Sequence, residues 1–120
     1  MSLLSTPLIQ LLSCALKLTA QRQAVNSQNT ANVDTPGYHT RDIDFRHELQ
    51  RAMSSGMEDD FPALAREVPG LIARPDGNNV NVDREGLVMA ENQLRFQTAV
   101  AVMRSEFSRL QSAISGGSGQ

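Results

Sequence analysis

The sequence predicts a mainly α-helical chain, with two long terminal helices packed as an antiparallel coiled-coil pair and a short irregular region between them. Apolar residues recur at three- and four-residue intervals near both ends of the 120-residue chain, which is the period of an amphipathic helix. With one Tyr, four Phe and no Trp, the chain has few large side chains for a globular core. These observations favour helices that bury their apolar seams against each other.

The first helix is expected to begin at Thr6-Pro7 and to run to about Asn32, because a capping hydroxyl followed by proline is typical of a helix start. Up to position 33 the only charged side chains are Lys17 and Arg22. This composition favours a helix packed on most sides in an assembly. An ordinary amphipathic helix with a glutamine-rich solvent face is the alternative. The apolar positions of the helix are Leu8, Leu11, Leu12, Ala15, Leu18 and Val25.

The first helix is expected to close with a tight turn within residues 29–38, which read NTANVDTPGY. Pro36 and Gly37 suit the two central positions of a type II turn, because proline presets φ and glycine accepts a positive φ. Asn29 and Asn32 lie three residues apart on the last helical turn. Their amides are expected to bond the unpaired carbonyls at the helix end.

The second long helix is expected to begin near Asn81 or Asp83 and to end around Ser115, where Gly116-Gly117 follow. Its apolar residues follow a 4-3-4-3-4 spacing, the a/d seam of a coiled coil. The simplest closure pairs the two terminal helices, and a homodimer through the C-terminal helix alone is the competing arrangement. Two helices cannot bury both seams fully, so other subunits are expected to cover the remainder. The seam consists of Phe96, Val100, Met103, Phe107, Leu110 and Ile114.

The middle region is expected to hold a turn, a short helix and a β-hairpin. Asp44 is placed to cap a helix in which Phe45 and Leu49 lie one turn apart. Asp76-Gly77 lies between two β-prone runs and predicts a small hairpin, with an extended arm as the alternative. The runs are residues 71–74 and 80–82. The predicted organisation is a terminal helical domain of residues 1–33 and 81–115, a middle region of residues 34–80 and a flexible tail of residues 116–120.

Composition and charge exclude several classes of function. The net charge is −2 and no basic cluster exists, which argues against nucleic acid as the main partner. No run of eighteen apolar residues occurs, so we expect no membrane span. The N-terminus lacks a basic segment and a cleavage site, so we expect no cleavable secretory signal. The single cysteine, Cys14, permits no intramolecular disulfide and is expected to pack as a small apolar residue.

No pattern of residues indicates catalysis. His39 and His47 are eight residues apart without cysteines nearby, which is not a zinc spacing. The glycines of the middle region are isolated, so no phosphate-binding loop exists. We therefore expect no catalytic residues, no metal site and no cofactor, and we expect both histidines at the surface.

The turn resembles the N-terminal signature of the flagellar rod, hook and hook-associated axial proteins, which reads Asn-x-Ala-Asn-x-x-Thr-Pro-Gly-Tyr. Residues 41–45, 76–85 and 90–97 further resemble blocks of the proximal rod (FlgB-type) family of flagellar basal-body rod proteins. Thr30, Gly86 and Phe96 depart from the residues usual there. The positions that match the signature are Asn29, Ala31, Asn32, Thr35, Pro36, Gly37 and Tyr38.

The resemblance implies a structural subunit that is not an enzyme. Such a subunit is exported by the flagellar type III apparatus without signal cleavage and polymerises into the periplasmic rod of the bacterial flagellum, which transmits torque for motility. The implied partners are other rod proteins, the rod–ring adaptor, the membrane-anchored ring, the export gate and further copies of the chain, with no nucleic acid and no direct membrane span. A soluble helical adaptor or export chaperone is the alternative.

One short segment resembles a second family feature. Residues 45–49 match the Phe-x-x-x-aliphatic element with which early flagellar substrates engage the export gate, carried here by Phe45 and Leu49. The alternative is that these two side chains form a packing pair on the subunit itself. The sequence leaves both interpretations open.

Overall fold

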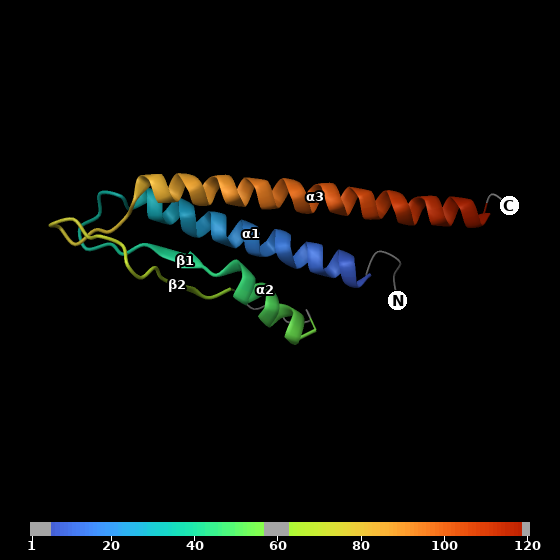
Figure 1. Cartoon of the computed structure of the whole chain (residues 1–120), viewed down its shortest axis with the longest axis horizontal. Helices are drawn as coiled ribbons and strands as arrows, with labels where there is room; N and C mark the ends of the chain where they lie inside the picture. The colour runs from blue at the N-terminus through green and yellow to red at the C-terminus, as the bar shows by residue number, and fades with distance from the viewer. Residues whose placement is uncertain (1–5, 57–62, 119–120) are drawn as a thin grey trace.

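The computed structural model describes residues 6–56 and 63–118. Two long helices, α1 (Pro7–Ala31) and α3 (Val82–Ser118), run antiparallel along the molecule, and the middle region packs beside α1 (Figure 1). The protein is elongated, with extents of 72 × 26 × 18 Å. The predicted class, a helical protein built on an antiparallel pair of terminal helices, is confirmed.

Helix α1 begins and ends close to the predicted positions. The Thr6 hydroxyl accepts a hydrogen bond from a first-turn amide at 3.2 Å, and a proline follows it. At the other end, the Asn32 side chain donates to the Gln28 carbonyl at 2.8 Å, which satisfies one orphan carbonyl. The prediction that Asn29 bonds the carbonyls at the helix end is wrong. Its amide instead points into the protein and donates to the Arg41 carbonyl and to Glu85.

The turn after α1 has the predicted geometry. Gly37 has a φ of 75°, which a type II turn requires at its third position. The Tyr38 amide donates to the Thr35 carbonyl at 3.2 Å and closes the turn. The chain therefore reverses immediately after the helix, and this reversal brings the middle region back against α1.

The middle region holds one short helix and one antiparallel strand pair, as predicted. Helix α2 (Phe45–Ser54) is capped by the Asp44 carboxylate, which accepts from the His47 amide at 3.1 Å. Strand β1 (Arg41–Ile43) pairs with β2 (Ala65–Glu67), with Asp42 opposite Arg66.

The position of the strand pair differs from the prediction. Residues 71–74 and 80–82 form no strands, although the chain does turn between them. The loop around Gly77 instead bonds to the turn after α1, because the Gly37 amide donates to the Asp76 carbonyl at 2.9 Å. The loop also closes on itself, because the Arg74 amide donates to the Asn78 carbonyl at 2.8 Å, but no backbone bond joins residues 71–73 to residues 80–82.

Helix α3 begins where predicted and ends later. The Asn81 side chain accepts from the Arg84 amide at 3.1 Å, so Asn81 is the cap and Asp83 is not. The predicted end at Ser115 is wrong, because the helix continues to Ser118. Each glycine costs about 1 kcal/mol in a helix interior, which weakens the last turn without ending it.

The face of α3 that α1 covers is not the apolar seam. Besides Val88, the buried positions recur every seven residues and carry mostly polar side chains. Because successive residues of a helix are about 100° apart, the seam lies roughly 70° round the helix axis from these buried positions. Phe96 is 52% exposed, Phe107 39% and Ile114 55%, whereas Val100, Met103 and Leu110 are half-buried. The buried residues at the seven-residue spacing are Glu85, Asn92, Ala99 and Glu106.

Helix α1 buries a mixed face. Ile9, Leu12 and Leu18 are its buried apolar residues, in the half near the N-terminus. The half near the turn buries polar residues instead: Thr19, Arg22, Asn26 and Asn29. Of the other predicted packing positions, Leu8 is 39% exposed, and Leu11, Ala15 and Val25 are half-buried. The buried face of α1 therefore has an apolar half and a polar half.

Candidate functional site

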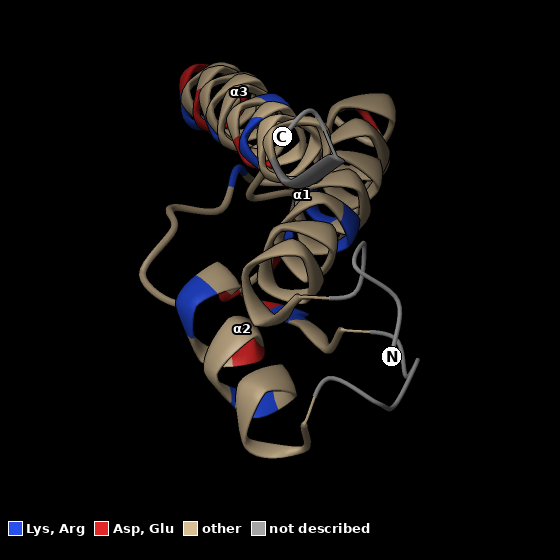
Figure 2. Cartoon of the chain, turned by 90° about the vertical axis from the view of Figure 1, so that its right-hand side faces the viewer, with Lys and Arg blue, Asp and Glu red and all other residues tan. Residues whose placement is uncertain are grey.

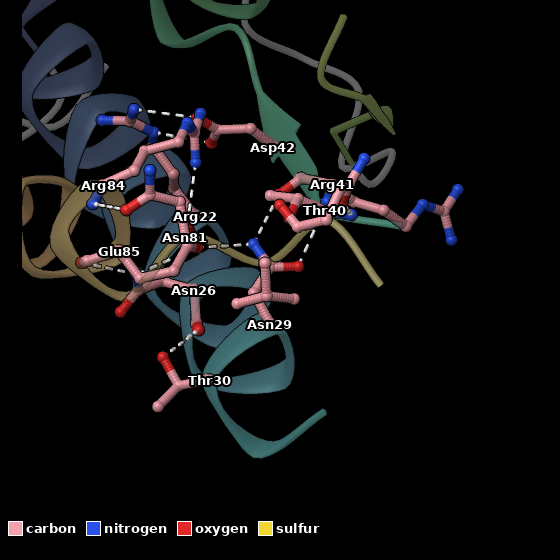
Figure 3. A network of polar contacts seen from close by, with 12 residues as sticks. Arg22, Asn26, Asn29, Thr30, Thr40, Arg41, Asp42, Asn81, Arg84 and Glu85 are labelled. Carbon is pink, nitrogen blue, oxygen red and sulfur yellow. Dashed lines mark hydrogen bonds and ion pairs between the residues drawn. The ribbon is translucent and has the colours of Figure 1, made fainter. Parts of the chain in front are cut away.

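The buried polar side chains gather where α1, β1 and α3 meet, beside the turn (Figure 3). They form two connected groups. We define the arginine cluster as Arg22, Asp42, Arg84, Glu85 and Glu91. We define the asparagine clasp as Asn26, Asn29, Tyr38, Asn78 and Asn79.

Asn29 is the centre of the clasp and is 1% exposed. Its Nδ2 donates to Glu85 Oε1 at 2.6 Å and to the Arg41 carbonyl at 2.7 Å. Its Oδ1 accepts from the Arg41 amide at 3.1 Å and from the Tyr38 hydroxyl at 3.0 Å. Both donors and both acceptor positions of the amide are therefore occupied, and one side chain joins α1, β1 and α3.

Asn26, one turn earlier in α1, makes the second link to α3. Its Nδ2 donates to the Glu85 carbonyl at 2.9 Å and to Glu85 Oε1 at 3.3 Å. Glu85 is 3% exposed and also accepts from Arg84 Nη1 at 2.9 Å. Its carboxylate lies in the first turn of α3, where the helix dipole favours negative charge. A buried carboxylate is stable here because several donors surround it.

Arg22, one of the two charged residues in α1, holds the arginine cluster together. Its guanidinium donates to both Asp42 oxygens, at 2.8 and 3.0 Å, and to Glu91 at 2.8 Å. This two-pronged arrangement matches the planar fork of arginine to a carboxylate. The hydrogen bond to Asp42 raises the pKa of Arg22 despite its burial.

Asp42 joins the strand to both long helices. Besides Arg22, it accepts from Arg84 Nη2 at 2.7 Å. Burial by itself raises the pKa of Asp42, but the hydrogen bonds from the two arginines outweigh it and hold the pKa below its ordinary value. Asp42 is therefore ionised at neutral pH.

Asn78 attaches the second loop to the turn. Its side chain is fully buried, and its Nδ2 donates to the Asn32 and Thr35 carbonyls, both at 2.8 Å. The neighbouring Asn79 accepts from the Thr40 amide at 2.6 Å. Two adjacent asparagines thus close the loop of residues 74–80 over the turn of residues 32–40.

The close approach of the two loops needs glycine. A Cβ on Gly77 would lie 3.3 Å from the Gly37 Cα, and Gly77 has a φ of 86°. A larger residue there would meet backbone and adopt a strained left-handed conformation. The signature glycine and the loop glycine therefore form one contact.

The structure brings together part of the predicted signature. Asn29 and Tyr38 share a hydrogen bond, and Asn32 closes the helix. Ala31, Thr35 and Pro36 lie at the surface of the turn. Sequence reasoning did not single out the partners that complete the site. The resembling blocks held four of them, which lie in residues 41–45 and 76–85, and a lone arginine in a nearly uncharged helix was a further signal. The missed residues are Arg22, Asn26, Asp42, Asn78, Asn79 and Glu85.

The remaining candidates lie apart from this site. His39 is exposed beside Glu67, and Cys14 is half-buried in α1, where burial raises the pKa of its thiol. Across residues 6–56 and 63–118, no three histidine, cysteine or acidic side chains gather as metal ligands. In the same ranges, no helix has the length and apolarity to span a membrane.

Phe45 and Leu49, the residues of the export-type element, are half-buried on α2. The Arg95 guanidinium of α3 lies over the Phe45 ring, 4.2 Å from its centroid. The folded protein therefore covers one face of this ring.

The arginine cluster and the asparagine clasp together offer fixed hydrogen bonds between segments. This arrangement is suited to holding the two long helices and the middle region in place.

Comparisons with known proteins all indicate the same family. Residues 9–39 match the family described as flagella basal body rod protein. The chain is 37% identical to the flagellar basal body rod protein FlgB of Salmonella typhimurium, covering 86% of this chain and 89% of the relative. It is 36% identical to FlgB of Yersinia ruckeri, covering 86% and 90%, and 34% identical to FlgB of Escherichia coli, covering 86% and 89%.

Proposed function

The chain belongs to the FlgB family of flagellar basal body rod proteins and is a structural subunit of that rod; from this premise we propose that it polymerises through the exposed flank of α3. We define the α3 stripe as the six residues of the seam. It carries three of the large exposed apolar side chains of the protein, at Phe96, Phe107 and Ile114. Exposed apolar surface of this kind marks interaction sites.

The geometry of the helix pair supports this role for the α3 stripe. Arg84 and Arg95 point from α3 to the middle region, through Asp42 and Phe45 respectively. With about 100° per residue, the α3 stripe lies roughly 120° away from them round the helix. The middle region thus leaves the stripe uncovered. Figure 2 shows charged residues on α2 and along α3, while α1 carries few, which suits close packing of subunits.

The clasp has a supporting part in the proposal. Because Asn26 and Asn29 bind Glu85, they determine which face of α3 meets α1. The remaining face is then the one presented to neighbouring subunits. Other rod proteins and further copies of the chain are the partners for that face, and the rod–ring adaptor and the membrane-anchored ring are the partners at the rod base.

Electron microscopy of basal bodies tests the proposal. A strain lacking only this chain is complemented with the wild type, with Phe96→Ser/Phe107→Ser, or with the matched control Leu87→Ser/Leu94→Ser. The control removes leucines that are 68% and 66% exposed on another face of α3. We expect rings without rods, and non-motile cells, for the deletion and for the stripe variant only.

Two outcomes contradict the proposal. Intact rods and hooks in the deletion strain would refute a role as an essential rod subunit and revive the alternative of an adaptor or export chaperone. Normal rods with the stripe variant, at normal protein levels, would refute assembly through the α3 stripe alone. The relatives compared above are named as rod proteins, which does not favour the chaperone alternative, and we propose no catalytic activity.

Export through the flagellar type III gate, in an unfolded state, is the second part of the proposal. Phe45 and Leu49 are the recognition element, and folding covers the Phe45 ring with Arg95. Phe45→Ala is expected to abolish secretion at normal cellular levels. Met53→Ala, an exposed position on the same helix, serves as the control. Normal secretion of the Phe45 variant with failed assembly would assign the residue to packing instead.

A further inference from the structure

A second surface of this protein is an open cleft between the middle region and α3, with a volume of about 550 Å³. Residues from β1, α2, β2 and α3 line it, including Asp42 and Arg84 of the arginine cluster. The α3 stripe lies roughly 120° away round α3, so the cleft is separate from the proposed assembly flank. Both surfaces are available to different partners at the same time.

The carboxylates in the cleft wall are already engaged. Asp42 is held by Arg22 and Arg84, and Asp44 caps α2. The two glutamates are engaged with residues outside the lining: Glu48 pairs with Arg51 at 2.6 Å, and Glu67 lies beside His39.

Three arginines in the wall have no carboxylate partner among the described residues. Arg46 on α2 and Arg66 on β2 are exposed and make no ion pair there. Arg95 on α3 stacks on the Phe45 ring, an arrangement that leaves the N–H groups at the guanidinium edge available to an acceptor. The wall has five arginines and four carboxylates, a formal charge of +1, although the whole chain has a net charge of −2.

Apolar side chains lie between these arginines. Leu64, Val68 and Pro69 line the same cleft, and Leu64 is 50% exposed. An extended peptide presents alternate side chains to opposite sides. The arginines and the apolar residues share this wall, so a bound strand would need carboxylates and apolar side chains on the same one of its two sides.

From this charge complementarity we propose that the cleft binds an extended, acidic segment of a partner protein. Arg46 and Arg66 bind its carboxylates, and Arg95 adds a third donor group. A nucleic acid fits less well, because Leu64, Val68 and Pro69 lie between the arginines and offer no donors to a continuous phosphate backbone. The proposal does not depend on assembly through the α3 stripe.

Fluorescence anisotropy with the full purified chain tests it. The probe is a fluorescein-labelled peptide of two Glu-Glu-Leu-Leu repeats, so that each side of the extended strand carries both residue types. Its eight residues span roughly 26 Å when extended. The test variant is Arg46→Gln/Arg66→Gln. The control is Arg104→Gln/Arg109→Gln, which removes the same charge from exposed positions on distal α3. We expect binding about tenfold weaker for the test variant and within about twofold of wild type for the control.

Two further measurements make the test specific. Arg46→Glu/Arg66→Glu should bind the matching peptide with lysine in place of glutamate, and circular dichroism checks that each variant stays folded. No binding of the glutamate peptide to the wild type would overturn the proposal. Equal weakening in the test and control variants, or equal affinity for a single-stranded oligonucleotide, would also overturn it, because general charge attraction would then suffice.

Discussion

At the residue scale, a few buried amides connect segments that are far apart in the sequence. Asn29 and Asn78 are each almost fully buried, and each bonds two other segments. A buried amide is favourable only when it is hydrogen-bonded. If one such side chain is removed, its former partners stay buried without a hydrogen bond, and their desolvation is no longer compensated. Single substitutions at these positions are therefore expected to have large effects.

Asn29→Ala is expected to lower the free energy of unfolding by about 3 kcal/mol, because Glu85, Arg41 and Tyr38 all lose a partner. Urea unfolding of the purified chain, followed by circular dichroism, measures this. Gln28→Ala, an exposed neighbour on the same helical turn, should change stability by less than about 0.5 kcal/mol. Equal effects of the two substitutions would contradict the central place of Asn29.

A pair of glycine substitutions separates backbone strain from loop contact. Gly70 and Gly77 both have a left-handed φ, at 83° and 86°, but only Gly77 approaches another segment. Gly70→Ala should cost about 1 kcal/mol from strain alone, and Gly77→Ala should cost about 1 kcal/mol more from contact with Gly37. Thermal unfolding of both variants gives the difference. Identical midpoints would mean that the two loops separate freely.

At the scale of elements, Asp42 couples the strand pair to both long helices through Arg22 and Arg84. Glu85 and Glu91 face the same two arginines from α3. Because the pKa of Asp42 is lower in the folded protein than in the unfolded chain, its ionised form stabilises the fold. That stabilisation is complete above the unfolded pKa, about 3.9, and is lost as the pH falls through the lower folded value.

This coupling predicts a pH-dependent effect of Asp42→Asn. At pH 7 the variant should be less stable by about 3 kcal/mol, because Arg22 is left buried without its main partner. The gap should narrow below about pH 4, where the Asp42 carboxylate of the unfolded chain takes up a proton while that of the folded protein is still ionised. Urea unfolding across that range measures the gap. A gap that stays constant down to pH 3 would show that the charge of Asp42 is not what links the elements.

At the scale of the whole molecule, α1 buries polar residues near the turn and apolar residues at its far end. Asn26 lies against Glu85, and Gln23 lies against Asn92 at 2.9 Å. Continued along two antiparallel helices of equal rise, this register places Pro7 roughly opposite residues 104–108. Beyond that point α1 no longer covers α3, and Phe107 and Ile114 are partly exposed.

Amide hydrogen exchange of the isolated chain should follow this division. Residues 22–31 and 82–95, held by the clasp and the arginine cluster, should exchange at least about a hundredfold more slowly than residues 107–116. Mass spectrometry of pepsin fragments measures the difference. Addition of partner rod proteins should slow exchange in residues 107–116 selectively. Uniform exchange along α3 in the isolated chain would contradict the division.

Several features followed from the sequence alone. The caps at Thr6 and Asp44 and the turn at Pro36-Gly37 were predicted correctly, because each depends on chemistry within a few residues. The heptad spacing located α3 and its apolar stripe. The asparagine-turn signature indicated the family, since it combines residue types whose joint occurrence is specific.

The tertiary structure alone decided which groups meet. The face of α3 that α1 covers depends on the hydrogen bonds of Asn26 and Asn29 to Glu85. The spacing of residues along one helix does not predict such a pairing between two helices. The strand pair forms between residues 41–43 and 65–67, and the Gly77 loop bonds both within itself and to Gly37. Local propensities describe a few neighbouring residues, whereas buried hydrogen bonds and charges depend on partners brought together from across the chain. The sequence thus determined the elements and the family, and the long-range pairing of polar groups determined the register, the clasp and the cleft.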